Sequence, residues 1–178
     1  MCGIAGFVDR SEPDASASIR RMLDLIRHRG PDGEGTHIET TKGLAFGMRR
    51  LSIIDIEGGR QPIWNEDETV GIVFNGEIYN HRELRFALPR HHFRSETDTE
   101  VLVHGYEEWG LEGLLQRIAG MFAFALLDAR EPDNVILMLV RDRLGIKPLY
   151  YSAAATRLGF ASEGSRQVAR VTWRRQHA

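Results

Sequence analysis

Short apolar segments bounded by turn residues are the feature that most constrains the fold of this chain. Their length and composition predict buried strands at residues 3–8, 44–50, 70–74, 121–128, 135–141, 149–152 and 158–161. Turn residues at 131–134 separate two of these segments and predict a hairpin. So many apolar strands beside few helices favour two sheets packed face to face, with helices on their outer sides. The predicted fold class is therefore a layered α+β domain.

Helical periodicity is confined to a few segments. Apolar residues at 19, 22, 23 and 26 form one face of a helix that should end near Arg27, with Asp14 or Ser16 as its cap. Asn80 and Glu83 have the spacing of a reciprocal capping pair, which predicts a short helix to residue 88. A further helix is predicted from residue 98 to residue 110, and residues 111–118 repeat the helical spacing. Residues 28–35 contain three glycines and a proline and predict a loop.

Charge and cysteine content exclude several kinds of function. A net charge of -2 and a pI near 6.4 provide no basic surplus for nucleic acid or an anionic membrane, so neither partner is expected. No stretch has the length and apolarity of a membrane span, and the N-terminus lacks the pattern of a secretory signal, so a cytoplasmic protein is expected. The single cysteine, Cys2, can form neither an internal disulfide nor a multi-thiolate zinc site. It is either a small buried side chain or a reactive thiol.

Cys2 can supply both a nucleophile and a base once Met1 is removed. A thiol has an ordinary pKa of about 8.5 and an α-amino group one of about 7.7–8.0, so the exposed amine can accept the thiol proton near neutral pH. Cysteine is small enough for the preceding methionine to be removed. Position alone, however, favours the alternative, a small buried cysteine without chemistry.

Asn75 and Gly76 directly follow the predicted strand at 70–74. They offer a side-chain amide donor and a backbone N–H that no Cβ obstructs, and such a pair can hold a developing oxyanion. Asn-Gly is also the commonest signal of a hairpin turn, and in isolation the pair favours the turn.

Arg50 and Asp98 are candidates for binding an α-amino acid. The guanidinium of Arg50 can recognise a carboxylate through two hydrogen bonds, and the carboxylate of Asp98 can accept hydrogen bonds from an ammonium group. Taken singly, each residue is more simply explained as a surface charge or, for Asp98, as a helix cap.

Seven blocks of the sequence form an ordered set of motifs. The blocks are Met-Cys-Gly-Ile-Ala-Gly-Phe at 1–7, His-Arg-Gly-Pro-Asp-Gly at 28–33, Arg-Leu-Ser-Ile at 50–53, Gln-Pro at 61–62, Phe-Asn-Gly-Glu-Ile-Tyr-Asn at 74–80, Thr-Asp-Thr-Glu at 97–100 and Arg-Asp-Arg-Leu-Gly-Ile-Lys-Pro-Leu-Tyr-Tyr at 141–151. In this order they resemble the glutaminase half of glutamine-dependent asparagine synthetases, and the resemblance runs from residue 1 to about residue 163. Other amidotransferases with an N-terminal nucleophile share the start, but the blocks at 28–33, 74–80 and 142–151 resemble the asparagine synthetase branch.

The resemblance implies a four-layer α/β/β/α sandwich of two antiparallel sheets, and it assigns catalytic roles. Cys2 would attack the side-chain amide of glutamine, form a thioester and release ammonia. Asn75 and Gly76 would form the oxyanion hole. No cofactor and no metal ion are expected for this reaction.

The resemblance also implies a binding site for glutamine. Arg50 would hold the α-carboxylate and Asp98 the α-ammonium group. Further residues expected in the same pocket are Leu51, Ser52, Ile53, Ile54, Asn75, Gly76 and Glu77. We expect Arg29, Gly30 and Asp32 to be architectural, with substrate contact as the alternative, and residues 142–151 to be structural.

The resemblance ends before the part of the family that consumes the ammonia. In the family a synthetase domain follows, which uses ATP and Mg to activate aspartate, and residues 1–178 contain no Ser-Gly-Gly-type pyrophosphate loop. Residues 164–178 hold four arginines and no acidic residue, so the sequence predicts an amidotransferase domain at 1–163 and an atypical tail at 164–178. The expected partners are a synthetase domain or subunit on another chain and a second copy of this chain.

Three functions remain open on the sequence alone. The first is an active glutaminase that works alone or delivers ammonia to a synthetase, and the residues favour it. The second is a silent remnant or a binding module that depends on a partner. The third is a sugar-phosphate amidotransferase, which the block at 142–151 disfavours.

Overall fold

The computed structural model describes residues 1–51 and 59–164. The chain divides into two compact units. We call residues 1–51 together with 148–164 the outer-segment unit, because it joins the two outer parts of the chain, and residues 59–147 the central unit. No helix in the described ranges is long and apolar enough to cross a membrane.

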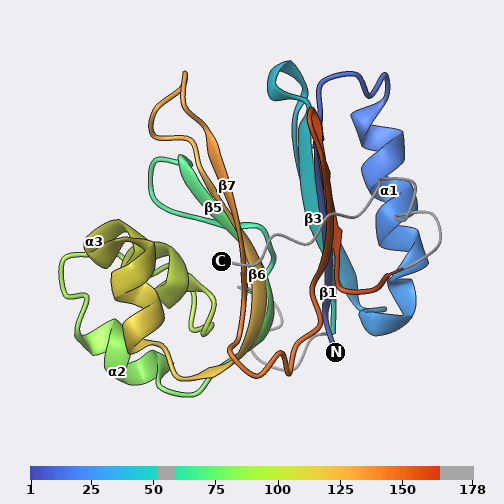
Figure 1. Ribbon diagram of the computed structural model, residues 1–178. Helices are drawn as coiled ribbons and strands as arrows, with labels where there is room; N and C mark the ends of the chain where they lie inside the picture. The colour runs from blue at the N-terminus through green and yellow to red at the C-terminus, as the bar shows by residue number, and fades with distance from the viewer. Residues whose placement is uncertain (52–58, 165–178) are drawn as a thin grey trace. The chain divides into compact units, whose positions relative to one another are not determined.

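The outer-segment unit is a five-stranded antiparallel sheet with one long helix on one face (Figure 1). The strands lie in the order β2-β3-β1-β9-β8. The elements are β1 (Gly3–Asp9), α1 (Ala15–Leu25), the 3-10 turn η1 (Arg27–Arg29), β2 (Gly33–Glu39), the 3-10 turn η2 (Thr40–Lys42), β3 (Leu44–Arg50), β8 (Tyr150–Ala154) and β9 (Arg157–Ala161).

Strand alternation assigns the side chains of β1 and β3 to two faces of this sheet. Ala5 and Phe7 of β1 and Ala45 of β3 pack with the apolar face of α1, which includes Ile19 and Leu23. Since successive side chains point to opposite faces, the residues between them point away from α1. The register pairs Gly3 with Arg49 and Ile4 with Met48. The same register continued by one residue sets Cys2 opposite Arg50, both on the face away from α1.

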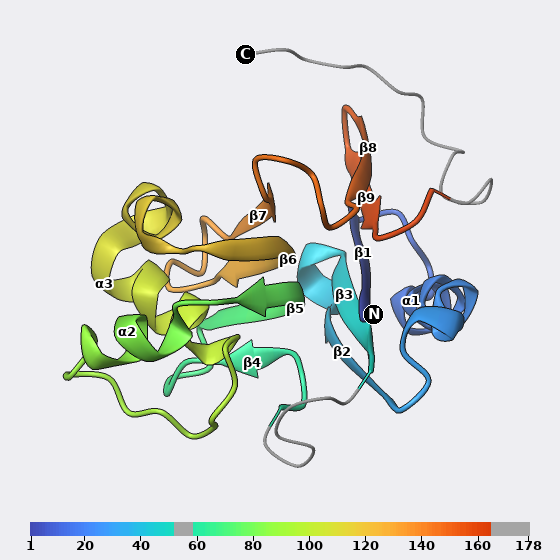
Figure 2. The same ribbon diagram turned by 90° about the horizontal axis from the view of Figure 1, so that it is seen from below.

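The central unit is a four-stranded antiparallel sheet in the order β4-β5-β6-β7, with α2 and α3 along one face (Figure 2). Its elements are β4 (Ile63–Trp64), β5 (Val70–Ile78), α2 (His81–Phe86), α3 (Glu100–Arg117), β6 (Gly120–Asp128) and β7 (Ile136–Arg141). Phe74 of β5 and Phe124 of β6 belong to the same buried cluster as Leu102 and Tyr106 of α3. The even-numbered residues of β5 therefore face the helices, and its odd-numbered residues point to the opposite face of the sheet.

The predicted fold class is confirmed. Each unit supplies one antiparallel sheet and one helical layer, so all the layers of the α/β/β/α class are present. Of the two proposed caps of α1, Asp14 is right and Ser16 is wrong, because the Asp14 carboxylate accepts the N–H of Ala17 at 2.9 Å. The predicted stop at Gly110 is a kink within α3, where Gly110 has a φ of 68°.

Three local predictions are wrong. The strand predicted to end at Phe74 continues as β5 through Ile78. The side chain of Asn80 does not cap α2; it donates to the carbonyl of Arg117 at 2.9 Å and accepts the N–H of Ala119 at 2.9 Å. Three of the eight residues in the predicted loop at 28–35 are strand, since β2 begins at Gly33.

Candidate functional site

The thiol of Cys2 lies against the backbone at the end of β3. Its Sγ accepts the N–H of Leu51 at 3.4 Å and lies 3.8 Å from the carbonyl oxygen of the same residue. The carbonyl oxygen of Cys2 accepts the Nε–H of Arg29 at 3.1 Å. Met1 is 62% exposed, whereas Cys2 is only partly exposed. The cysteine is therefore held at the start of β1 with a backbone donor directed at its sulfur.

Two adjacent arginines at the end of β3 have different surroundings. Arg49 donates to the carbonyl of Leu23 at 3.1 Å and forms ion pairs with Asp24 and with Glu34, the latter at 2.7 Å. These contacts tie it to α1 and β2. Arg50 is equally buried, at 9% exposure, and by alternation its side chain belongs to the opposite face of the sheet, the face of Cys2.

Residues 29–32, within the segment predicted as a loop at 28–35, hold Cys2 and Arg50 in place. Arg29 donates to the carbonyl oxygen of Cys2 at 3.1 Å and to the carboxylate of Glu163 at 2.9 Å. The hydrogen bond from Arg29 to Glu163 lowers the pKa of Glu163. Gly30 lies so close to β3 that a Cβ there would be 2.4 Å from the carbonyl carbon of Arg49. The N–H of Asp32 donates to the carbonyl of Arg50 at 3.0 Å. These contacts support the architectural role predicted for Arg29, Gly30 and Asp32.

In the central unit, Asn75 and Gly76 lie inside β5 and do not form a hairpin turn. They pair with Ala123 and Phe122 of β6. Asn75 is 1% exposed, and its Nδ2 is buried without a hydrogen-bond partner in the described part of the chain. A Cβ at position 76 would come within 2.3 Å of the carbonyl oxygen of Met121, so only glycine fits there. The hairpin interpretation of this pair is wrong.

Asp98, another predicted site residue of the central unit, lies along one backbone edge of β5. The N–H of Phe74 donates to the side chain of Gln61 at 2.6 Å, and the N–H of Ile78 donates to the carboxylate of Asp98 at 2.8 Å. Backbone N–H groups of a strand alternate in direction, so the N–H of Gly76 points to the same edge, between these two acceptors. Asn75, Gly76 and Asp98 therefore lie together along β5.

The helix-cap interpretation of Asp98 is wrong. Helix α3 begins at Glu100 after Thr99, and no side-chain hydrogen bond caps it. Burial raises the pKa of Asp98, and the hydrogen bond from Ile78 only partly opposes that shift. Glu77 is exposed, and by strand alternation its side chain lies on the same face of β5 as Asn75, away from the helices. The predicted pocket residues Ser52, Ile53 and Ile54 lie outside the described residues.

Sequence reasoning assigned no role to Gln61, although it lies in one of the seven blocks. Its side-chain oxygen binds β5 at Phe74, and its Nε2 lies 3.4 Å from the hydroxyl of Thr99, next to Asp98. The structural role predicted for residues 142–151 is supported at their start. The carboxylate of Asp142 accepts the N–H groups of Ile146, Lys147 and Phe122, at 2.9, 3.0 and 3.2 Å.

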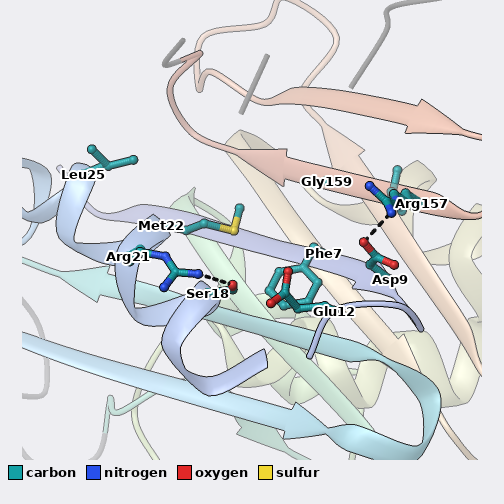
Figure 3. A pocket seen from close by; sticks show the side chains of 10 residues that line it. Phe7, Asp9, Glu12, Ser18, Arg21, Met22, Leu25, Arg157 and Gly159 are labelled. Atoms are coloured by element: carbon teal, nitrogen blue, oxygen red, sulfur yellow. Dashed lines mark hydrogen bonds and ion pairs between the residues drawn. The ribbon is translucent and has the colours of Figure 1, made fainter. Parts of the chain in front are cut away.

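A cavity of about 250 Å³ lies elsewhere in the outer-segment unit (Figure 3). It opens between α1 and the far ends of β1 and β9, and its lining includes Phe7, Met22 and Leu158. An ion pair between Asp9 and Arg157, at 3.1 Å, lies at its edge. None of the predicted site residues in the described ranges lines this cavity, and it lies on the α1 face of the sheet.

Comparison with known proteins identifies the family of this chain. The model of the glutamine amidotransferase domain family matches residues 1–177. An asparagine synthetase (glutamine-hydrolyzing) 2 from Bacillus subtilis (strain 168) is 44% identical over 167 residues, which cover 92% of this chain and 22% of the relative. An asparagine synthetase (glutamine-hydrolyzing) 2 from Arabidopsis thaliana is 44% identical over 168 residues, which cover 93% of this chain and 27% of the relative.

The chain thus spans about a quarter of the length of these relatives. The family model nevertheless covers nearly every residue of the chain, from Met1 onward. This chain belongs to the glutamine amidotransferase domain family and is related to the glutaminase domain of asparagine synthetases.

Proposed function

We propose that this chain hydrolyses glutamine to glutamate and ammonia, with Cys2 as the nucleophile. The observation that carries the proposal is the backbone N–H of Leu51 directed at Sγ of Cys2, at 3.4 Å, at the start of β1. This contact positions the sulfur, and the thiolate form of a cysteine is the form that attacks an amide.

The α-amine of Cys2 acts as the base after Met1 is removed. The exposed position of Met1 leaves the bond between Met1 and Cys2 open to an aminopeptidase. The amine takes the thiol proton, and the sulfur forms a bond to the amide carbon of glutamine. The proton passes to the leaving nitrogen as the carbon–nitrogen bond breaks, and ammonia departs. Water then hydrolyses the thioester, which yields glutamate and restores the thiol.

Asn75 and Gly76 stabilise the oxyanion that forms at the attacked carbon. The buried Nδ2 of Asn75 has no hydrogen-bond partner among the described residues, and an unpaired buried donor costs free energy unless a ligand supplies an acceptor. The edge N–H of Gly76 provides the second donor. Donors that are fixed before the reaction lose no energy in reorienting when charge develops.

Arg50 and Asp98 recognise the α-carboxylate and the α-ammonium group of glutamine. Arg50 is buried on the face of Cys2, where a forked guanidinium can bind a carboxylate through two hydrogen bonds. Asp98 is oriented by Ile78, beside Asn75 and Gly76. Leu51 and Glu77, with residues 52–54, complete the proposed pocket.

Ammonia is the product that a synthetase would consume. The relatives are named as asparagine synthetases that hydrolyse glutamine, and this chain corresponds to about a quarter of their length. We infer that the ammonia passes to a synthetase domain or subunit, where ATP and Mg would be required. The hydrolysis itself requires no cofactor.

An electrophilic analogue of glutamine tests the assignment of the nucleophile. A diazoketone in place of the side-chain amide should alkylate the purified, Met1-processed chain once, and peptide mass mapping should locate the label on Cys2. Excess glutamine should slow the labelling. Labelling of any other residue, or a rate unaffected by glutamine, would refute the proposed site.

A further inference from the structure

Four side chains of metal-ligating type converge in the central unit, outside the proposed glutaminase residues. They come from the loop after β4, from the segment that joins α2 to α3, and from α3 itself. They are Glu66, His91, His104 and Glu107, and one candidate donor atom of each lies within 4.8 Å of all the others. Oε2 of Glu107 lies 3.1 Å from Nδ1 of His104 and 3.8 Å from Nδ1 of His91, and Oε2 of Glu66 lies 3.9 Å from Nδ1 of His104.

The second ring nitrogen of each histidine faces a carboxylate outside the cluster. Nε2 of His104 lies 3.7 Å from Oε1 of Glu100, and Nε2 of His91 lies 3.4 Å from Oε2 of Glu108. For His91, this carboxylate favours the proton on Nε2 and leaves Nδ1 as the lone-pair donor, whereas Nε2 of His104 is buried without a hydrogen-bond partner in the described residues. Carboxylate partners of this kind orient histidines that bind metal ions.

Both glutamates of the cluster are oriented in the same manner. Oε1 of Glu107 accepts the side-chain amide of Asn65 at 2.7 Å, and Oε1 of Glu66 accepts the backbone N–H of His92 at 3.1 Å. Their Oε2 atoms remain directed at the histidines. All four side chains therefore present one donor atom to a common point, and for His91, Glu66 and Glu107 a hydrogen bond from outside the cluster holds the other polar atom.

Burial and charge at the cluster also suit a cation. The side chain of His104 is 1% exposed, with the ring of Phe93 packed edge-on at 4.8 Å, whereas the side chain of Glu66 is 38% exposed and leaves one side open. Four carboxylates, those of Glu66, Glu100, Glu107 and Glu108, surround the two imidazoles. When both imidazoles are neutral, a divalent cation offsets part of this negative charge.

We propose that Glu66, His91, His104 and Glu107 form a site for a divalent transition-metal ion of the zinc class. Zinc binds histidine nitrogen and carboxylate oxygen at about 2.0–2.2 Å in a tetrahedron, which sets the donors about 3.3 Å apart. Side-chain rotations that draw the most distant donors together by roughly 1.5 Å would produce this geometry. The bound ion would link the β4–β5 loop and the α2–α3 connection to α3, and that connection leads to Asp98.

Zinc titration of the complete chain, free of affinity tags and stripped with a chelator, tests the proposal. Isothermal calorimetry should show one equivalent of Zn²⁺ bound by the wild-type chain. His91→Ala should weaken zinc binding by at least about 10-fold, the smaller loss that even an outer partner of a metal site produces. His92→Ala is the matched control, because His92 is exposed and contributes only its backbone N–H, and it should bind as the wild type does.

Two further variants distinguish zinc binding at this cluster from binding at the thiol or at scattered surface groups. Cys2→Ala removes the one thiol that could compete for zinc and should retain the bound equivalent. Zinc should raise the thermal midpoint of the wild type but not of Glu66→Gln, whose partly exposed side chain can be changed without disturbing the core. Absence of stoichiometric binding, equal affinity in His91→Ala, or loss of binding in Cys2→Ala would each overturn the proposal.

Discussion

The side-chain amide of Asn75 is buried, and Nδ2 lacks a hydrogen-bond partner within the described residues. An unsatisfied buried donor of this kind costs about 1–3 kcal/mol of stability. Sites that pre-orient donors for a transition state commonly trade stability for activity. This single atom therefore connects the packing of β5 to the chemistry proposed for it.

Asn75→Ala should lower kcat about 10²–10³-fold, which corresponds to about 3–4 kcal/mol of lost oxyanion stabilisation. The free energy of unfolding should stay the same or rise, because the variant removes an unpaired donor. Steady-state ammonia release and chemical denaturation measure the two effects. Asn134→Ala, in an exposed turn, serves as the control and should change neither. An unchanged kcat in Asn75→Ala would exclude its proposed role.

Arg50→Ala and Arg49→Ala should fail in different ways, although the two residues are adjacent. Arg50→Ala should raise KM for glutamine by about 10–100-fold with little change in kcat, because the lost carboxylate contact is made equally to substrate and transition state. Arg49→Ala should instead lower stability, because it loses the hydrogen bond to Leu23 and two ion pairs. The loss should be only about 1–2 kcal/mol, since Asp24 and Glu34 are exposed and solvent screens their charges. Kinetics and thermal melts of both variants check this. A fall in kcat alone in Arg50→Ala would contradict the assignment.

The raised pKa of Asp98 predicts a pH dependence of glutamine binding. Only the ionised carboxylate attracts the substrate ammonium group, so KM should rise as pH falls through the pKa of Asp98. Because burial raises that pKa above the ordinary aspartate value, the rise should begin at a higher pH than for an exposed aspartate. Asp98→Asn should give a high KM at every pH. A KM that is independent of pH in the wild type, while circular dichroism shows an intact fold, would exclude this role.

At the residue scale, the sequence predicted which residues belong to the proposed site better than it predicted which residues contact one another. The resemblance pointed to Asn75, Gly76 and Asp98, and within the central unit these do lie together along β5. The hydrogen bonds by which Gln61 connects β5 to Thr99 were not predicted. A glutamine that bonds a backbone amide thirteen residues away has no local sequence signal.

Among the elements, apolar strands were predictable and polar edge strands were not. β3 has the predicted bounds, 44–50, because every one of its residues is buried. β2 was missed, because it lies at the edge of its sheet and carries polar residues and two glycines in place of an apolar run. The β5 strand was cut short because Asn-Gly, the strongest turn signal, lies inside it and is held there by pairing with β6.

Gly30, in the loop between α1 and β2, and Gly159, in β9, offer a matched pair of glycine substitutions. Gly30→Ala should lower stability by about 1–3 kcal/mol and reduce activity as well, because its Cβ would collide with the backbone of Arg49 and Arg50. Gly159→Ala in β9 meets nothing within 4 Å and should change stability by less than about 0.5 kcal/mol. Denaturant titration of both variants gives the comparison. Equal stabilities would show that the close approach at Gly30 is dispensable.

At the scale of the molecule, each unit presents its own set of proposed site residues. The outer-segment unit carries Cys2, Arg50 and Leu51, and the central unit carries Asn75, Gly76 and Asp98. Family membership rests on a match over residues 1–177, while the relatives extend to about four times the length of this chain. A domain boundary at residue 163 stays a prediction, because residues 165–178 lie outside the described part.

The most direct test of the proposed glutaminase combines intact mass with ammonia release from glutamine, on the wild-type chain and on Cys2→Ala. The wild type should have lost Met1 and should release ammonia, whereas Cys2→Ala should be folded and processed but inactive. A wild-type fraction that retains Met1 should also be inactive, because its base amine is tied up in a peptide bond. Turnover by Cys2→Ala or by the Met1-retaining form, or a processed and folded wild type that releases no ammonia, would contradict the proposed mechanism.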